Sequence, residues 1–426
     1  MKARGKEADA PINNNNNNDD DSNCSNNNSS RQAEDIVSIT EAEIAEITEG
    51  STTLYVPKSS LDTTVPPKAP AFYNPYATLN RNLTVAAYRV FAEKRSSGSG
   101  TVTMADVLAG TGARGVRVAV EVPRINEVYI NDGNPRAIEL AKRSASANRV
   151  TDKCRFSVQD ACRLLMEHSA YKSRFNIVDI DPFGSPAPYL DCALRALERE
   201  GILSATATDT AALCGVYPDV AYRRYNGYSL RTEYCHETGI RLLLGAAAHQ
   251  AMRLELGISP IFAHRTRHYL RIYVSVHLGA GWVDRTYSQI GLIHHCFKCG
   301  YRSTGEPLRI DCPMCGSTLR RAGPLWIGEL YDKEFISEMS EDCQKHMFRD
   351  GVKMLSAAVE ETGMPPTYFT ADQVAADIGV RSPSLDAIIS HLRDEGFRAS
   401  RSALNPKGVK TDAPAEAVRI VVQQLT

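Results

Sequence analysis

The sequence predicts an α/β fold built on a parallel sheet, followed by a cysteine-bearing insert and a smaller α+β region. Three observations support this: short apolar runs alternate with helical patterns, two CxxC pairs interrupt the alternation near Cys296, and it does not resume beyond about residue 325. Strands alternating with helices form a parallel sheet covered on both faces. The predicted strands are 103–109, 127–131, 154–158, 176–180 and 202–207, and a late apolar run at 269–277 extends the sheet.

Helices are predicted around these strands and again near the C-terminus. The first three cover residues 85–93, 135–148 and 187–200. Thr370 and Gln373 then have the spacing of a capping box, and Gly379 ends the helix that follows. Ser382-Pro383 starts another helix, with an apolar stripe formed by Leu385, Ile388, Ile389 and Leu392 and an end at Gly396. A basic hairpin-like stretch at 398–410 completes either a winged-helix-like module or a small α+β packing domain.

Composition excludes several classes of protein. The 426 residues include 49 Lys+Arg and 50 Asp+Glu, and 43% are hydrophobic, which excludes a wholly disordered chain or a polybasic coat protein. There is no apolar run of about 18 residues and no apolar signal region at the start, so we expect no membrane association and a cytosolic or nuclear setting, with cytoplasmic as the assignment. The Asn-rich residues 1–35 are predicted to be a disordered tail.

A glycine loop follows the first strand of the alternating region. Gly110, Gly112 and Gly115 form a G-x-G-x-x-G pattern between a strand and a helix. Such a loop lets a ligand approach the backbone and the positive end of the helix. Asp132 ends the next strand, where a carboxylate can accept hydrogen bonds from ribose hydroxyls. This pair suits a dinucleotide or S-adenosylmethionine equally well.

The fourth strand ends in Asp179-Ile-Asp181-Pro-Phe183-Gly, which favours S-adenosylmethionine. An acidic residue, proline and an aromatic residue at this edge are typical of methylation at an exocyclic amino nitrogen. Asp181 can accept the amine's N–H hydrogens, and Phe183 can stack on a flipped base. Asp160 and Ala161 follow the third strand, where an acidic side chain and the next N–H commonly meet adenine; alone, Asp160 could equally be a helix N-cap.

The cysteines predict a structural metal site rather than disulfides. Cys296, Cys299, Cys312 and Cys315 form two CxxC pairs twelve residues apart, a spacing suited to tetrahedral Zn²⁺ with no open position for catalysis. There are 11 cysteines and no export signal, so we expect reduced thiols or metal ligands. Outside the metal site and the tail, we expect ordinary core or half-buried cysteines.

Positive charge is concentrated in residues 221–330, which hold 14 Lys/Arg against 7 Asp/Glu. Arginines interleaved with tyrosines suit phosphate pairing and base stacking, so this region predicts a nucleic-acid surface. The arginines concerned are Arg223, Arg224, Arg231, Arg265, Arg267, Arg271, Arg320 and Arg321.

Several strings together resemble the tRNA (guanine(26)-N(2))-dimethyltransferase family of archaea and eukaryotes. They are FYNP…NR (72–81), AGTGARGVR (109–117), DIDPFGSPAPYLD (179–191), TATDTAALCG (206–215), YCHETGIRLLL (234–244) and KTDAP (410–414). The resemblance implies transfer of one or two methyl groups from S-adenosylmethionine to N2 of guanosine 26. It also implies that Arg81 and Arg114 bind the methionine end of the cofactor, Asp132 its ribose, and Asp160 with Ala161 its adenine. Asp181 and Phe183 match the residues that hold the target base, and Asn82 stands where the family usually has Asp.

The resulting prediction is a Rossmann-like class I methyltransferase domain (36–285), a four-cysteine zinc segment (286–325) and a tRNA-binding α+β domain (326–426). We expect tRNA as the partner, with no obligate protein partner. One alternative is an amino-methyltransferase acting on another RNA nucleobase. A second is a non-enzymatic zinc-ribbon nucleic-acid binder with an inactive methyltransferase fold.

Overall fold

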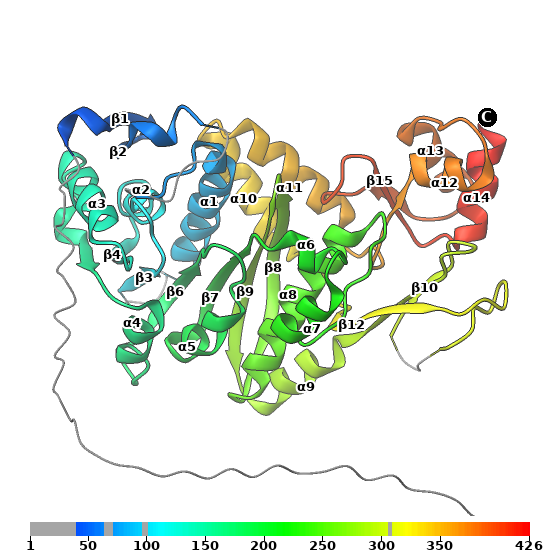
Figure 1. Ribbon diagram of the computed structural model, residues 1–426, viewed down its shortest axis with the longest axis horizontal. Helices are drawn as coiled ribbons and strands as arrows, with labels where there is room; N and C mark the ends of the chain where they lie inside the picture. Colours follow the sequence, from blue (N-terminus) through cyan, green and yellow to red (C-terminus); the bar gives the residue numbers. More distant parts are fainter. Residues whose placement is uncertain (1–39, 64–70, 96–100, 306–308) are drawn as a thin grey trace, which may run out of the picture. The chain divides into compact units, whose positions relative to one another are not determined.

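A seven-stranded mixed sheet forms the centre of the protein in the computed structural model, which describes residues 40–63, 71–95, 101–305 and 309–426 (Figure 1). The strand order is β5-β4-β3-β6-β7-β9-β8, and β3 to β7 run parallel to one another. β9 pairs antiparallel with both β7 and β8. The strands are β3 (Val102–Asp106), β4 (Ile125–Asn131), β5 (Cys154–Ser157), β6 (Phe175–Ile180), β7 (Leu197–Ala207), β8 (Leu256–Thr266) and β9 (Tyr269–Leu278). The predicted tail, residues 1–35, lies outside the described residues.

The five predicted parallel strands and the late sheet strand are all confirmed. The strand β8 at the sheet edge was not predicted, because Pro260 breaks its apolar pattern and the pairing with β9 shifts register between Pro260 and Phe262. The predicted helix 187–200 was too long. A 3-10 turn and the short α5 (Leu190–Arg195) occupy its first part, and β7 already begins at Leu197.

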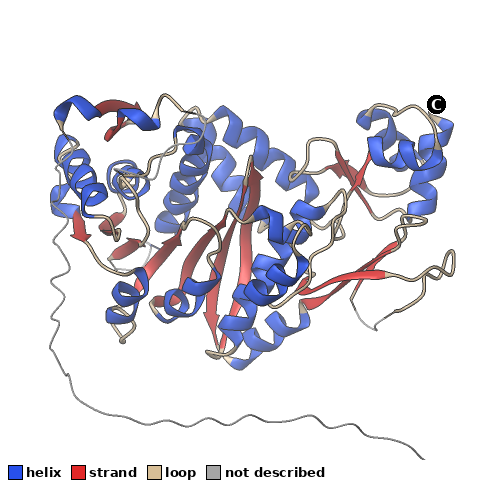
Figure 2. Ribbon diagram, viewed as in Figure 1, coloured by secondary structure: helices blue, strands red, loops and turns tan. Residues whose placement is uncertain are grey.

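Helices surround the strands in Figure 2. The sheet is buried between them, and its strand β6 is buried at every position. Helix α8 is also buried on most sides, which explains why its middle, residues 242–248, is apolar throughout. Besides α5, the helices up to the cysteine segment are α1 (Thr78–Arg95), α2 (Ala113–Glu121), α3 (Pro135–Ala147), α4 (Ala161–Glu167), α6 (Thr210–Leu213), α7 (Pro218–Tyr225), α8 (Cys235–Met252) and α9 (Ala280–Ser288).

Two small antiparallel sheets lie outside the central one. The hairpin of β1 (Ile44–Glu49) and β2 (Thr52–Pro57) turns at Gly50, whose φ is 61°. The cysteine segment is carried by the sheet β11-β10-β12. Its strands are β10 (Ile290–His295), β11 (Arg302–Thr304) and β12 (Arg320–Trp326).

The C-terminal region divides between two hydrophobic cores. Helices α10 (Lys333–Lys345) and α11 (Arg349–Glu361) place side chains such as Ile336 and Leu355 in the same core as the central sheet. The elements after residue 368 form a separate core around Ile388, Leu392 and Val421. These elements are β13 (Phe369–Thr370), α12 (Ala371–Ile378), α13 (Leu385–Asp394), β14 (Ala399–Arg401), β15 (Gly408–Thr411) and α14 (Ala415–Gln424).

The last module has the helix pair and the hairpin that the winged-helix interpretation predicts. Helices α12 and α13 are followed by β14 and β15, which pair antiparallel within the sheet β13-β15-β14. Gly379 ends α12 with a φ of 73°. The predicted capping box is wrong: the Thr370 side chain makes no cap bond, and Gln373 instead bonds Asp377 one turn further on. The next helix starts after Ser384, whose hydroxyl accepts the Ala387 N–H, and not at Ser382-Pro383.

A buried ion pair joins the last module to the central helix α8. The ammonium group of Lys410, 1% exposed, lies 2.8 Å from Glu237 Oε1 and 3.3 Å from Glu361 Oε1. Glu237 also pairs with Arg241 and accepts the N–H of Thr367. The described residues from 40 onward belong to one compact unit.

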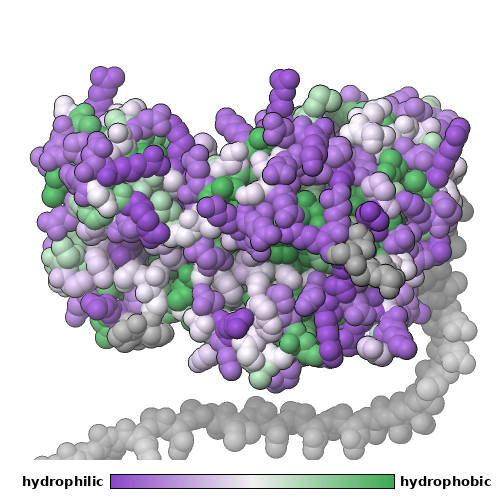
Figure 3. All heavy atoms as spheres, turned by 180° about the vertical axis from the view of Figure 1, so that it is seen from behind, coloured by the Kyte–Doolittle hydropathy of each residue, from purple (hydrophilic) through white to green (hydrophobic). Residues whose placement is uncertain are grey.

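The outer surface is mostly polar. On the face opposite to that of Figure 1, Figure 3 shows hydrophilic side chains with apolar ones scattered in small groups. Scattered apolar side chains of this kind are normal on a folded protein. Among the described residues, no helix combines the length and apolarity needed to cross a bilayer.

Candidate active site

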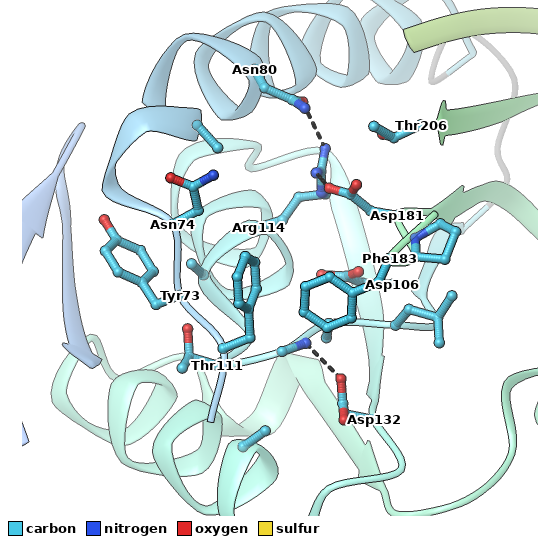
Figure 4. A pocket seen from close by; sticks show the side chains of 18 of the residues that line it. Tyr73, Asn74, Asn80, Asp106, Thr111, Arg114, Asp132, Asp181, Phe183 and Thr206 are labelled. Atoms are coloured by element: carbon cyan, nitrogen blue, oxygen red, sulfur yellow. Dashed lines mark hydrogen bonds and ion pairs between the residues drawn. The ribbon is translucent and has the colours of Figure 1, made fainter. Parts of the chain in front are cut away.

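A cavity of about 460 Å³ lies at the carboxyl ends of the parallel strands. The chain leaves β3 toward β4 and β5 on one side, and β6 and β7 lie on the other, so β3 and β6 mark the point where strand order reverses. Ligands of open α/β sheets bind at such a switch point. The cavity is lined by the glycine loop, by Asp132 and by the Asp181–Phe183 loop (Figure 4).

The glycine loop and Asp132 meet as predicted. The N–H of Gly110 donates to Asp132 Oδ2 at 2.8 Å, and the N–H of Asn134 donates to Oδ1 at 2.9 Å. Burial raises the pKa of Asp132. A carboxylate has about four acceptor sites, so capacity remains for ribose hydroxyls.

The first two glycines of the loop have different structural roles. Gly110 lines the cavity with a φ of 54°, where a Cβ would lie 2.7 Å from the carbonyl oxygen of Phe72. Gly112 has a φ of 72°, and a Cβ there would lie 2.5 Å from Cβ of Ala141. Gly112 therefore allows close packing of helices α2 and α3, while Gly110 shapes the cavity wall.

Arg114 reaches from helix α2 to the predicted catalytic carboxylate. Its guanidinium pairs with Asp181 Oδ2 and donates to Asn80 at 3.1 Å (Figure 4). It also donates to Thr84 at 2.9 Å. The Asp181 side chain is 28% exposed. In this structure the Arg114 side chain therefore orients Asp181, and the carboxylate is held at the cavity wall with one oxygen bonded.

Behind Asp181 lies a buried charge network. Asp179 accepts from Arg271 at 2.6 Å and from the hydroxyl of Tyr88 at 2.5 Å. Arg114 also lies 3.5 Å from Asp179, and the charges of Arg114 and Arg271 outweigh burial and hold the pKa of Asp179 below its usual value. Asp106, which lines the cavity, has its pKa raised to about 7, chiefly by burial and then by the charge of Asp179.

Arg271 was wrongly predicted to lie on an RNA-binding surface. Its side chain is 0% exposed and pairs with Asp179. Arg271 lies on β9 beside β7, where its guanidinium also donates to Thr206 at 2.6 Å. The arginine therefore compensates a buried carboxylate below the cavity.

Arg81 lines the cavity but is already paired. Its guanidinium donates to both carboxylate oxygens of Glu49, at 2.6 and 2.5 Å, and to the carbonyl of Asn74 at 3.0 Å. Glu49 also accepts from Arg117 at 2.7 Å. Although burial opposes it, the two arginines lower the pKa of Glu49 to about 2. Glu49, the last residue of β1, thus holds the Arg81 side chain that projects from helix α1.

Phe183 presents a half-exposed ring at the cavity rim. The ring is 54% exposed and packs edge-to-face on Phe72, with centroids 4.6 Å apart. The loop is fixed just beyond it, because the N–H of Gly184 donates to Thr208 Oγ1 at 2.6 Å and the N–H of Thr208 donates back to the Gly184 carbonyl at 2.8 Å. One face of a base can therefore meet a positioned aromatic ring.

Asp160 and Ala161 do not line the cavity in this structure. Asp160 is the N-cap of α4 and accepts the N–H of Arg163 at 2.9 Å, while Ala161 is buried. The capping role that the sequence left open is therefore present, and the predicted adenine contact stays a prediction.

Sequence reasoning gave no role to several residues of the cavity wall, among them Asp106, Thr206, Thr208 and Tyr269. Asp106 ends β3, and Thr206 and Thr208 lie at the end of β7. Their positions at the carboxyl ends of predicted strands could have identified these three residues. Tyr269 begins a strand antiparallel to β7, and nothing in its local pattern indicates a cavity.

The four predicted zinc ligands lie together. Sγ of Cys296 is 3.5 Å from Sγ of Cys315, Sγ of Cys299 is 3.6 Å from Sγ of Cys312, and all four lie within 4.8 Å of one another. Sulfurs bound to one Zn²⁺ at about 2.3 Å are roughly 3.8 Å apart, so the cluster fits this ion.

The two cysteine turns have the same backbone geometry. Gly300 and Gly316 have φ of 74° and 68°, and each donates its N–H at 2.9 Å to the carbonyl of the first cysteine of its pair. The two turns therefore face each other as equivalent halves of one site.

One prediction about the remaining cysteines is wrong. Cys162 of α4 and Cys192 of α5 form a disulfide, although we expected only thiols or metal ligands. The first turns of these two helices bring Cα atoms within 5.5 Å across a sequence separation of 30, which spacing alone does not reveal. Cys154, Cys214 and Cys343 are buried and Cys235 is half-buried, as expected.

A second hollow, of about 530 Å³, lies between the cysteine segment and the loop after α6. Four arginines line it, together with Tyr228 and the exposed ring of Phe297. Tyr222 stacks on Tyr228 with centroids 4.5 Å apart. No ion pair links these arginines to a carboxylate in the described part of the chain. They are Arg231, Arg309, Arg320 and Arg321. We refer to this hollow as the basic groove.

Comparison with known proteins identifies the family. Residues 50–423 match the family model described as N2,N2-dimethylguanosine tRNA methyltransferase. The chain belongs to this family. Within the N2,N2-dimethylguanosine tRNA methyltransferase family, it is 38% identical to the tRNA (guanine(26)-N(2))-dimethyltransferase of Methanothermobacter thermautotrophicus over 86% of this chain and 95% of the relative. The enzyme of the same name from Methanobrevibacter smithii is 35% identical, over 91% and 99%.

A solved structure of the family supports the fold. Trm1 from Pyrococcus horikoshii in complex with S-adenosyl-L-methionine superposes with a TM-score of 0.78 and 32% identity, covering 88% of this chain and 99% of that one. The family resemblance and the Rossmann-like α/β fold predicted from the sequence are therefore confirmed.

Proposed function

We propose that this protein transfers methyl groups from S-adenosylmethionine to the exocyclic N2 of guanosine 26 in tRNA. The observation that carries the proposal is the meeting of two predicted sites in one cavity. Asp132 and the glycine loop form one wall, and Asp181 with Phe183 forms another. Family membership supplies the substrate, and the setting we propose is the cytoplasm.

The residues present fit S-adenosylmethionine. Asp132 would bind the ribose hydroxyls, and the N-terminal end of α2 would favour the carboxylate of the methionine moiety. Arg81 and Arg114 line the same region and supply positive charge, although each already has a carboxylate partner. We retain Asp160 and Ala161 as the proposed adenine contacts. When bound, the cofactor supplies an electrophilic methyl group on a sulfonium.

Asp181 and Phe183 would act on the base. The lone pair of a nucleobase amine is delocalised into the ring, so the amine is a poor nucleophile. By accepting an N–H hydrogen, Asp181 turns the lone pair toward the incoming methyl group. Phe183 would stack on the flipped guanine, as a half-exposed ring at the rim allows.

Each methyl transfer leaves a cationic amine that is strongly acidic. Its proton can leave to Asp181 or to water, so no strong base is needed. A second transfer requires the monomethylated amine to re-enter with its methyl group turned away from Asp181. The carbonyl and hydroxyl contacts between Gly184 and Thr208 would keep the loop in place through both transfers.

The basic groove is our proposed tRNA contact. Its four guanidinium groups are available for phosphates, and its aromatic rings can stack on bases or riboses. Zn²⁺ bound by the four cysteines would be structural, because all four tetrahedral positions are thiolates. We propose that the region from residue 326 also contacts tRNA.

The test is methylation of an unmodified tRNA transcript with labelled S-adenosylmethionine. We expect label at guanosine 26 and none in a transcript carrying adenosine there, with methylated guanosine identified by nucleoside mass analysis. Equal labelling of both transcripts would refute the assignment to guanosine 26. Label on a different base would favour the alternative amino-methyltransferase.

A further inference from the structure

A second group of metal-ligating side chains lies apart from the four-cysteine cluster. Cys214 caps the C-terminal end of α6, Cys235 is the first residue of α8, and His236 follows it. The two Sγ atoms and one imidazole nitrogen all lie within 4.8 Å of one another. The function proposed above uses none of these three side chains.

The separations are close to those of bound ligands. Cys235 Sγ lies 3.9 Å from His236 Nδ1. Zinc binds cysteine sulfur at about 2.3 Å and histidine nitrogen at about 2.0–2.1 Å, which places tetrahedral ligand atoms roughly 3.5–3.8 Å apart. Side-chain shifts of about 1 Å or less would bring the three atoms onto one ion.

The number of cysteines in the chain does not by itself explain why these three side chains lie so close together. In the described part of the chain, only two groups of three or more His, Cys, Asp or Glu side chains have ligand atoms this close, and the other is the four-cysteine cluster. Cys162 and Cys192 are bonded to each other, and Cys154 and Cys343 belong to neither group. The chain has brought together residues from two segments, at 214 and at 235–236.

Positive charge lies close to the two thiols. Cys235 lies at the positive N-terminal end of α8, an 18-residue helix. The guanidinium of Arg265, whose Nε is buried without a hydrogen-bond partner, lies near enough to both cysteines to interact with them electrostatically. Two thiolates would neutralise a divalent ion. Cys235 and His236 are only half-buried, so water can reach the fourth position.

We propose that Cys214, Cys235 and His236 bind a divalent cation of zinc type, with a solvent molecule as the fourth ligand. The ion would tie the segment after β7 to the start of α8. That segment begins with Thr208, which lines the active-site cavity, and continues to Gly215, which lines the basic groove. A metal here would therefore fix the chain between the two surfaces.

The test is metal content of the full-length protein. Wild type, Cys235→Ser and Cys343→Ser are purified with reductant, equilibrated with ZnSO₄ and dialysed into metal-free buffer. We expect Cys235→Ser to hold one zinc per chain fewer than wild type, and Cys343→Ser, which changes a buried thiol outside both groups, to match wild type. The difference in zinc content between the two variants measures this site alone, because the four-cysteine cluster is unchanged in both.

A second variant tests the same site in case Cys235→Ser does not fold. His236→Gln changes a half-buried side chain and should weaken zinc binding by more than about 100-fold, since loss of even an outer-shell partner costs a metal site about 10- to 100-fold. Equal zinc in wild type and both folded variants would overturn the proposal. So would a Cys214–Cys235 disulfide in peptide mass analysis of the zinc-treated protein.

Discussion

Replacing Asp181 with alanine should abolish most methyl transfer while leaving cofactor binding intact. The carboxylate is the acceptor we assign to the target amine, and one of its oxygens already faces Arg114. Removing a preorganised group that stabilises charge in the transition state typically costs about 100- to 1,000-fold in kcat. We therefore expect a loss of roughly 100-fold or more.

The structure argues that this variant will fold. Arg114 keeps a second carboxylate, Asp179, at 3.5 Å, and keeps its bonds to Asn80 and Thr84. The Asp181 side chain is also partly exposed, so its loss leaves no large buried void. S-adenosylmethionine affinity should be unchanged, because Asp132 and the glycine loop are not altered.

The assay combines single-turnover methylation of a tRNA transcript with calorimetric binding of S-adenosylmethionine. Asp191→Ala is a matched control, because it removes an exposed carboxylate that lies just after the same loop and pairs only with Arg195 among the described residues. Equal rates for wild type and Asp181→Ala would refute the role of Asp181. A large loss of cofactor affinity would instead place Asp181 in the cofactor site.

Three further predictions test other parts of the structure. Glu49 has its pKa lowered from 4.5 to about 2, so its stabilisation is complete above about pH 4.5 and is lost as the pH falls toward 2. In denaturant unfolding, the free energy of unfolding of wild type should fall by about 3 kcal/mol more than that of Glu49→Gln across this pH window. The same pH dependence in both proteins would contradict the ion pairs of Glu49 with Arg81 and Arg117. Exchanging Arg320 and Arg321 for glutamine should weaken tRNA binding and reduce its salt slope by roughly 1 to 2, whereas the same change at the exposed Arg155 and Arg163 should not. Metal analysis should find that Cys296→Ser loses one zinc per chain and unfolds the cysteine segment; unchanged zinc content would exclude the four-cysteine site.

Those parts of the site with a short-range pattern were predictable. The glycine loop with Asp132 and the Asp181–Phe183 loop each follow a predicted strand, and parallel strands bring their carboxyl ends to one edge. The four cysteines were equally clear, because ligand spacing in two tight turns is itself a local signal. For these residues, position along the chain determines position in space.

Features that depend on distant contacts were not predictable. In the sequence, Arg271 looks like the surface arginines around it. Its buried partner, Asp179, becomes evident only when β9 is seen to pair with β7 in the sheet. The Cys162–Cys192 disulfide depends on how two short helices meet. Likewise, Arg114 carries a role implied for the cofactor, yet its guanidinium pairs with Asp181, which follows the distant strand β6.

The buried lysine of β15 has a consequence for any attempt to shorten this enzyme. Deleting the last module would remove Lys410, whose ammonium group bridges the buried carboxylates of Glu237 and Glu361; Glu237 would keep Arg241, but Glu361 would lose its cation. Stranding a charge in this way costs about 3–5 kcal/mol, a large share of the stability of a typical domain. The rest of the protein therefore depends on the terminal module for a buried counterion, Lys410. The two parts should unfold in a single cooperative transition.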